Sequence, residues 1–289
     1  MQSLELVRLS RLMQQTSGSE SVVVGLIDGP VLTGHPDLEG TGIDTLSGAA
    51  SCLRPNSVAC LHGTFVAGIL HARRGSTAPA LCPGCRLLVR PIFVEDDRAG
   101  FPSCEPEDLA LAMVDCIRAG ARLLNLSVGL LQARPSAVRV LEAALNLAAR
   151  QSVLVLAAAG NQGMVGASAL ARHPAVLPVA ASTANGTIAS LSNLGHSVGR
   201  RGLAAPGDSI ESLAPDGGTR RFGGTSAATP FVTGTAALLW SLYPEASVAR
   251  IRHSLVHAAR AARTSIAPPL LDAQAAWDAL KASRMGVLA

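Results

Sequence analysis

The sequence predicts a single α/β domain in which a mostly parallel sheet is flanked by helices on both faces. Short apolar runs rich in branched residues alternate with longer stretches of helical spacing along nearly the whole chain, as in successive βαβ units. Several of these runs are apolar at every position, which is typical of strands buried on both faces. With 48% hydrophobic and 15% charged residues among 289, the chain can bury a large core.

The elements follow in order from the N-terminus. Residues 1–21 carry apolar side chains interrupted by Glu5, Arg8 and Arg11, so we expect them to form an amphipathic extension with one short helix. This extension is expected to pack on the body of the domain, which covers residues 22–289. Gly120 is placed to cap the helix that precedes it. Strands are expected at residues 21–27, 86–93, 122–128, 153–159 and 176–181, and helices at residues 107–119, 136–150, 226–242 and 246–262.

Charge and hydropathy exclude two classes of partner. The formal charge is +4, but the arginines are scattered without a basic run, and Lys281 is the only lysine, so nucleic-acid binding is not expected. No run reaches the roughly 18 apolar residues of a membrane span. The N-terminus lacks the apolar core of a signal peptide, so we expect a cytoplasmic protein with no membrane partner. Nothing in the sequence specifies an oligomeric state.

The six cysteines permit two interpretations. Cys82 and Cys85 have the CxxC spacing of a zinc or redox site, with Cys52 and Cys60 as possible further ligands, but one CxxC is a weak metal signal. A turn with free or bridged cysteines is favoured over zinc. Because no export signal is visible, we expect the thiols to be reduced.

Three polar residues stand at junctions between predicted strands and helices. Asp28 follows VVVGLI directly, His62 lies in CLHGTFVAGIL at the start of an apolar helix, and Ser226 lies in FGGTSAATPFVTG at the start of another. Each alone could be structural, as a turn residue or a helix cap. Together, the chain order Asp, His, Ser matches one of the convergent arrangements of the catalytic triad.

At this point the sequence resembles the subtilase family. The resemblance rests on VVVGLIDGPV, HGTFVAG and GTSAATPFVTG around the three residues, and on LLDAQAAWDAL as a closing segment. In addition, LAAAGNQG, which contains Asn161, resembles the family's oxyanion-hole segment, and LLNLSVG resembles its substrate-binding strand. The resemblance implies a three-layer subtilisin-like fold and a serine endopeptidase that works through an acyl-enzyme.

The chemistry fits these residue types. A serine hydroxyl is a weak nucleophile and needs a base whose pKa is near neutral, which His62 supplies, while Asp28 would fix its tautomer. Asn161 and the backbone N–H of Ser226 are the expected donors to the oxyanion. Small residues near the site, such as Gly63 and Gly224, are expected to admit the substrate backbone. The resemblance places the substrate between two segments, one formed by Ser127, Val128 and Gly129 and the other by Ala158, Ala159 and Gly160. Neither segment carries a charge, which favours a substrate with a small or apolar side chain before the cleaved bond.

Two departures narrow the resemblance. Gly29 follows Asp28 directly, where the family's usual motif has serine or threonine, and the stretch CRLLVRPIFVEDD adds to this difference. In both features the sequence resembles the subtilases of cyanobactin-type pathways, which mature ribosomally made peptides. We expect no inhibitory pro-domain before the first strand, which would suit an intracellular enzyme. The leading hypothesis is a peptidase that acts on a precursor peptide. A macrocyclase, a general intracellular protease and a catalytically silent peptide-binding module are the alternatives.

No cofactor is expected. Asp37 and Asp44 could bind structural calcium, as subtilases often do, but no acidic cluster surrounds them, so no metal is assigned. His253 and His257 have the i, i+4 spacing of a metalloprotease helix without its glutamate, and a solvated helix face is favoured.

Overall fold

A computed structural model describes residues 2–46, 52–95, 103–130, 135–166, 168–258 and 264–284. Within these residues, seven strands form one sheet in the order β2-β3-β1-β5-β7-β8-β9, and every neighbouring pair is parallel. The strands are β1 (Val23–Asp28), β2 (Ile43–Thr45), β3 (Arg86–Pro91), β4 (Ser103–Cys104), β5 (Leu123–Leu126), β6 (Gly129–Leu130), β7 (Leu154–Ala158), β8 (Val176–Ser182), β9 (Leu203–Pro206), β10 (Ile210–Leu213) and β11 (Thr219–Phe222).

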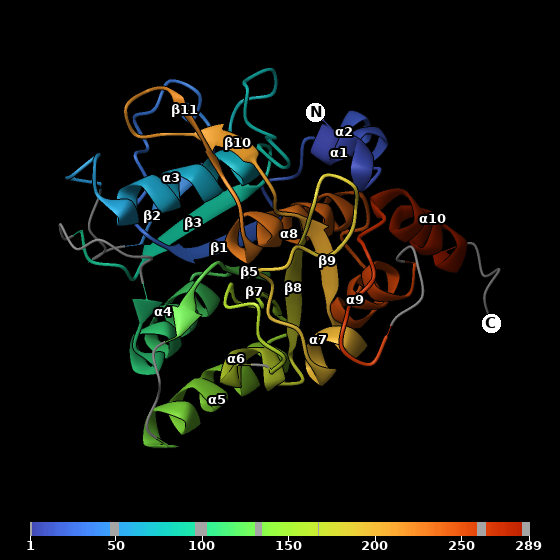
Figure 1. Cartoon of the computed structure of the whole chain (residues 1–289). Helices are drawn as coiled ribbons and strands as arrows, with labels where there is room; N and C mark the ends of the chain where they lie inside the picture. The colour runs from blue at the N-terminus through green and yellow to red at the C-terminus, as the bar shows by residue number, and fades with distance from the viewer. Residues whose placement is uncertain are drawn as a thin grey trace.

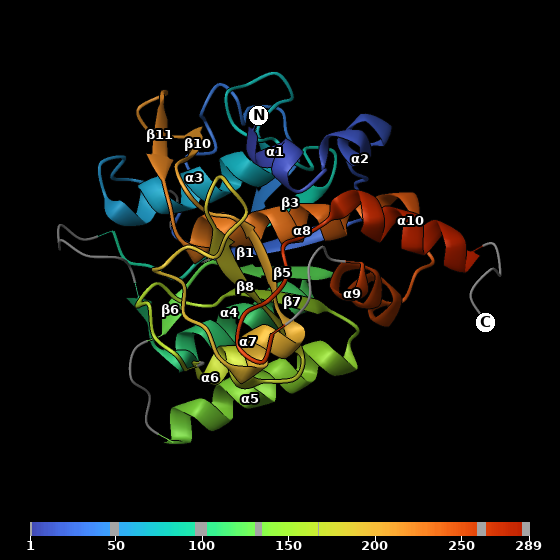
Figure 2. The same cartoon turned by 45° about the vertical axis from the view of Figure 1, so that its right-hand side comes forward.

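Helices cover both faces of the sheet, which confirms the predicted fold class. Figure 1 shows α3 and α8 on one face and α4 and α5 on the other, and Figure 2 shows the same three layers from another side. The helices are α1 (Gln2–Leu6), α2 (Ser10–Gln15), α3 (Val58–His71), α4 (Pro106–Arg118), α5 (Pro135–Arg150), α6 (Ala169–Arg172), α7 (His196–Arg201), α8 (Thr225–Leu242), α9 (Val248–His257) and α10 (Ala273–Arg284).

Alternation along the central strands divides the core in two. Leu154 and Leu156 of β7 belong to the cluster under α3 and α8, whereas Val155 and Ala157 belong to the cluster under α4 and α5. Successive side chains of a strand point to opposite faces, so a strand between two helical layers must be apolar throughout. The predicted strands agree with those observed to within a few residues; β2, β4, β6 and β9 to β11 were not predicted.

The N-terminal segment forms two helices instead of the one predicted. Arg8 ends α1 with a positive φ of 54°, and the N–H groups of Arg8 and Leu9 donate to the carbonyls of Glu5 and Leu4. This pattern closes a helix when the residue after it is left-handed. Arg8 then forms a salt bridge with Asp272 (2.9 Å), and Leu9 is fully buried, so the segment packs against the body of the domain.

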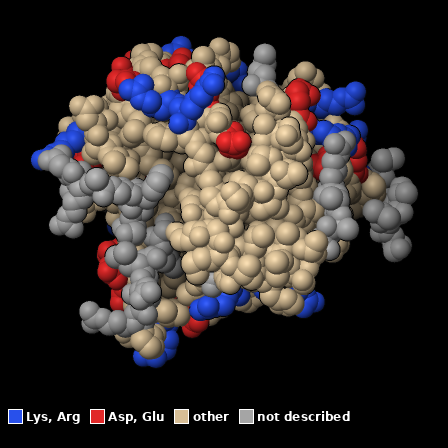
Figure 3. All heavy atoms as spheres, in the orientation of Figure 1, with Lys and Arg blue, Asp and Glu red and all other residues tan. Residues whose placement is uncertain are grey.

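Charged side chains are sparse on one face of the molecule. In Figure 3 a broad central area is uncharged, and the acidic and basic groups gather towards its rim. No helix in the described part of the chain is long and apolar enough to cross a membrane.

Candidate active site

Asp28 ends strand β1 at the carboxyl edge of the sheet, where the sequence places it. Its carboxylate is fully buried, and its Oδ1 accepts a hydrogen bond from the backbone N–H of Gly29 (2.6 Å). A buried carboxylate is costly unless a partner compensates for its charge. That partner is His62, whose Nδ1 lies 2.5 Å from Asp28 Oδ1.

His62 projects from α3, one turn inside the helix. The structure corrects the expectation that the helix starts at the histidine: Ser57 is the N-cap, and its side chain accepts a hydrogen bond from the backbone N–H of Cys60 (3.1 Å). Serine is among the preferred capping residues because its oxygen satisfies a backbone N–H that has no partner in the helix. His62 is therefore held by a formed helix.

Two glycines let α3 approach the chain that leaves β1. A Cβ on Gly29 would lie 1.9 Å from the carbonyl oxygen of Ala59, and a Cβ on Gly63 would lie 2.4 Å from the carbonyl oxygen of Gly29. Interiors are close-packed, so neither Cβ can be accommodated without moving the helix. The expectation that Gly63 leaves room for the substrate backbone is wrong, because Gly29 and Pro30 occupy that space. The close approach of the Ala59 carbonyl to Gly29 explains why glycine directly follows Asp28.

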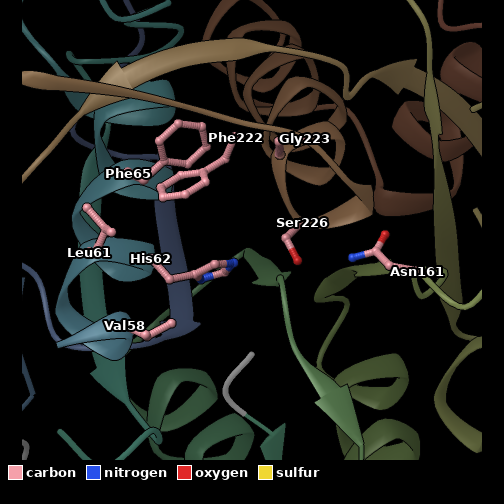
Figure 4. A pocket seen from close by; sticks show the side chains of 9 residues that line it. Val58, Leu61, His62, Phe65, Asn161, Phe222, Gly223 and Ser226 are labelled. Carbon is pink, nitrogen blue, oxygen red and sulfur yellow. The ribbon is translucent and has the colours of Figure 1, made fainter. Parts of the chain in front are cut away.

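Asp28 controls the protonation of His62. Burial lowers the pKa of His62, whereas the negative charge of Asp28 and its hydrogen bond raise it; the two contributions of Asp28 together prevail, so the pKa lies above the usual 6.5. With Nδ1 engaged by Asp28, the imidazole ring points towards Ser226 (Figure 4).

Ser226 is the second residue of α8. Gly224 precedes the helix with a φ of +117°, a conformation that favours glycine, and a Cβ there would lie 2.9 Å from Asn161 Nδ2. The Ser226 side chain lies between His62 and Asn161 in Figure 4, and its hydroxyl donates a long hydrogen bond to the carbonyl of Ser127 (3.4 Å).

Thr225 orients Asn161, a role that sequence reasoning missed. The backbone N–H and the hydroxyl of Thr225 both donate to Asn161 Oδ1, at 2.8 and 2.9 Å. Since the amide oxygen is engaged in this way, the amide nitrogen of Asn161 faces Ser226 (Figure 4). The only signal in the sequence is that a threonine stands directly before Ser226.

Both predicted substrate-binding segments lie against the start of α8. The hydroxyl of Ser127 donates to the carbonyl of Ser226 (3.0 Å), and the N–H of Gly160 donates to Thr225 Oγ1 (3.2 Å). The predicted strand 122–128 is shorter in the structure, because β5 ends at Leu126, and Gly129 begins β6, which pairs with β4. The side chains of Val128, Ala158 and Ala159 are buried.

An apolar pocket adjoins the histidine. Phe65 and Phe222 pack edge to face, with ring centroids 5.0 Å apart, above His62 in Figure 4. The pocket is lined by Val58, Leu61, His62, Phe65, Asn161, Phe222, Gly223, Ser226 and Ala227.

The cysteines depart from the expected arrangement. Cys52 and Cys60 form a disulfide with their Cα atoms 5.5 Å apart, so the expectation of reduced thiols is wrong for this pair, and neither can be a zinc ligand beside Cys82 and Cys85. The reason is that loop and helix bring Cys52 next to Cys60 at the start of α3, away from the buried CxxC. Cys82, Cys85 and Cys116 carry free thiols.

The remaining candidates lie outside the site. The Asp44 carboxylate forms a salt bridge with Arg86 (2.6 Å). His253 and His257 are exposed on α9 with their rings stacked 4.1 Å apart, as expected of a solvated helix face.

Comparison with known proteins gives consistent results. The model of the subtilase family matches residues 19–277. Subtilisin BL of Lederbergia lenta is 32% identical over 240 residues, which cover 82% of this chain and 83% of the relative. Among solved structures, a mutant of the protease domain of PatA has a TM-score of 0.85 at 34% identity, covering 92% of this chain and 97% of that chain. The prenylagaramide maturation protease PagA has a TM-score of 0.83 at 30% identity, covering 94% and 98%.

The PatG macrocyclase domain has a TM-score of 0.80 at 21% identity, covering 94% of this chain and 95% of that chain, a similarity that extends to the fold alone. The parallel sheet and the matches over most of the chain lead to one assignment: this protein belongs to the subtilase family and is a subtilisin-like serine endopeptidase.

Proposed function

We propose that Ser226 is the nucleophile, His62 the general base and Asp28 the group that orients His62, in an enzyme that removes a leader or follower segment from a ribosomally made precursor peptide. The catalytic assignment rests on one observation: His62 Nδ1 lies 2.5 Å from Asp28 Oδ1, and the imidazole ring of His62 points at Ser226. The amide nitrogen of Asn161 lies on the other side of Ser226.

The proposed reaction starts with transfer of the Ser226 hydroxyl proton to Nε2 of His62, while Oγ bonds to the carbonyl carbon of the substrate. The negative charge that forms on the carbonyl oxygen is stabilised by the amide of Asn161 and the backbone N–H of Ser226, which lies in the first turn of α8 and has no partner within the helix. The C–N bond then breaks, and His62 returns its proton to the leaving amine. Water hydrolyses the acyl-enzyme by the same steps.

The surroundings of Ser226 support a placement for the peptide. The backbones of residues 127–129 and 158–160 would pair with an extended substrate on the acyl side, and since neither wall is charged, a small or apolar residue would precede the cut. His62 must protonate the leaving amine, so the residue after the cut would lie beside His62, in the pocket that Phe65 and Phe222 line. An apolar residue on that side fits best.

Similarity supports the precursor-peptide assignment. The solved maturation protease PagA is 30% identical over nearly the whole chain. Subtilisin BL is similar to a comparable extent, so a general protease is the second candidate function. We further propose that residues 1–21 are an extension to one peptidase domain, residues 22–289.

The catalytic assignment is tested by labelling with a fluorophosphonate. We expect one labelled residue, Ser226, and we expect Ser226→Ala to abolish both labelling and peptide hydrolysis while the protein stays folded. Ser136→Ala, at an exposed serine of α5, is the matched control and should change neither. Labelling of another residue, or undiminished hydrolysis by Ser226→Ala, would contradict the assignment.

The substrate assignment is tested by digestion of a proteome-derived peptide library, with product termini identified by mass spectrometry. A maturation enzyme should cut few peptides at a narrow motif. Cleavage of most peptides, and of denatured casein, would favour the general protease instead.

A further inference from the structure

Pro230 leaves the carbonyl of the proposed nucleophile without its usual helical partner. Within an α-helix, the N–H of residue i+4 donates to the carbonyl of residue i. Pro230 stands inside α8, four residues after Ser226, and proline has no N–H to donate. The carbonyl of Ser226 is therefore available to another donor, and it accepts the hydroxyl proton of Ser127 (3.0 Å).

The Ser127 hydroxyl is held in this orientation by a second buried side chain. Its single proton goes to Ser226, and its oxygen accepts a hydrogen bond from Asn125 Nδ2 (3.0 Å). The other end of the Asn125 amide is also engaged, because Oδ1 accepts the hydroxyl of Thr233 (2.8 Å). Asn125 and Thr233 are fully buried, and Ser127 is 3% exposed. Water does not compete for these groups, so each hydrogen bond has a definite geometry.

The chain of hydrogen bonds returns to the helix on which it started. Thr233 lies seven residues after Ser226, two turns along α8 and therefore on the same face of the helix. α8 is thus attached to the end of β5 at two points: the carbonyl of Ser226 through Ser127, and the side chain of Thr233 through Asn125. Two attachments on one face fix both the rotation of the helix and its position along its axis.

We propose that Asn125 and Thr233 are positioning residues, which set the distance of Ser226 from the substrate-binding segment that begins at Ser127. The inference rests on the proposed function. Neither residue touches the substrate, so their loss should leave substrate binding unchanged and slow the attack of Ser226. A displacement of about 1 Å costs on the order of 100-fold in rate when reacting atoms must be aligned.

Helix α8 offers a matched pair of variants for the test. Thr233 and Thr235 are both fully buried, and each hydroxyl is within reach of the carbonyl four residues before it, but only Thr233 also reaches Asn125. We expect Thr233→Val to lower kcat and the rate of fluorophosphonate labelling at least tenfold with KM changed less than twofold. Thr235→Val should change kcat less than threefold, and Thr233→Ser, which keeps the hydroxyl, should restore most of the rate.

Equal kcat in Thr233→Val and Thr235→Val would overturn the proposal. If Thr233→Val does not fold, Pro230→Ala decides, because it restores an N–H that competes with Ser127 for the Ser226 carbonyl while favouring the helix. A several-fold lower kcat without a lower Tm supports the proposal, and an unchanged kcat refutes it. For both variants, the residue that the fluorophosphonate labels tests the proposed function separately. If Ser226 is still labelled, but more slowly, the catalytic assignment of Ser226 stands.

Discussion

The contact between Gly29 and α3 predicts a large effect from a single methyl group. In Gly29→Ala the new Cβ would lie 1.9 Å from the carbonyl oxygen of Ala59, whereas ordinary contact begins at 3.4 Å. Helix α3 must therefore move by about 1.5 Å, because a backbone carbonyl cannot rotate away as a flexible side chain does. The same shift would take His62 Nδ1 from 2.5 Å to about 4 Å from Asp28, beyond hydrogen-bond distance.

The expected loss of kcat/KM is about 10²–10⁴. The lower limit is the cost of a 1 Å misplacement, and the upper limit is the cost of losing the correct tautomer of a triad histidine. The φ of Gly29 is not positive, so backbone strain does not contribute. In addition, the pKa of His62 should fall, because Asp28 no longer raises it.

The assay is hydrolysis of a chromogenic peptide across pH, with Tm measured in parallel. The control is Gly34→Ala, since a Cβ on Gly34 meets no atom within 4 Å and its φ is not positive. If Gly29→Ala kept kcat/KM within threefold of Gly34→Ala at equal Tm, the close approach of α3 would not be what sets the geometry of His62 and Asp28.

Three further predictions concern pH, redox state and products. First, kcat/KM should rise with pH through a pKa above 6.5, because only the neutral imidazole of His62 accepts a proton; an acid limb centred below 6.5 would contradict the raised pKa. Second, dithiothreitol should lower the free energy of unfolding by about 2.5 kcal/mol, the entropy of the short loop closed by Cys52 and Cys60, and Tm by about 4 °C, with activity largely retained. Cys52→Ser should lose this sensitivity, and complete inactivation by dithiothreitol would show that the disulfide holds the site itself. Third, products should be linear by mass spectrometry. The described residues between Asp28 and Ser57 form β2 and turns and contain no helix that could shield the acyl-enzyme from water, so hydrolysis should prevail. Recovery mainly of a species lighter by one water than the linear peptide would contradict this.

The fold class could be predicted from the sequence, and candidate site residues could be identified in it, because short-range patterns carry both signals. Fully apolar runs identify strands buried on both faces, and the carboxyl ends of parallel strands share one edge, so Asp28, which directly follows such a run, was expected at that edge. The cap at Gly120 follows from the glycine alone, since the N–H groups of Gly120 and Ala121 close α4 on the carbonyls of Ile117 and Cys116.

Only the tertiary structure decided how these residues are held. Asn125 and Thr233 are 108 residues apart, and Thr225 and Asn161 are 64 apart, so no local pattern relates them. The disulfide of Cys52 and Cys60 depends on the path of a loop, and the place of Gly29 against Ala59 depends on the distance between a strand and a helix. Hydrophobic periodicity specifies which face of an element is buried, whereas the pairing of buried polar atoms depends on the separation and rotation of packed elements, which close packing of the whole core determines.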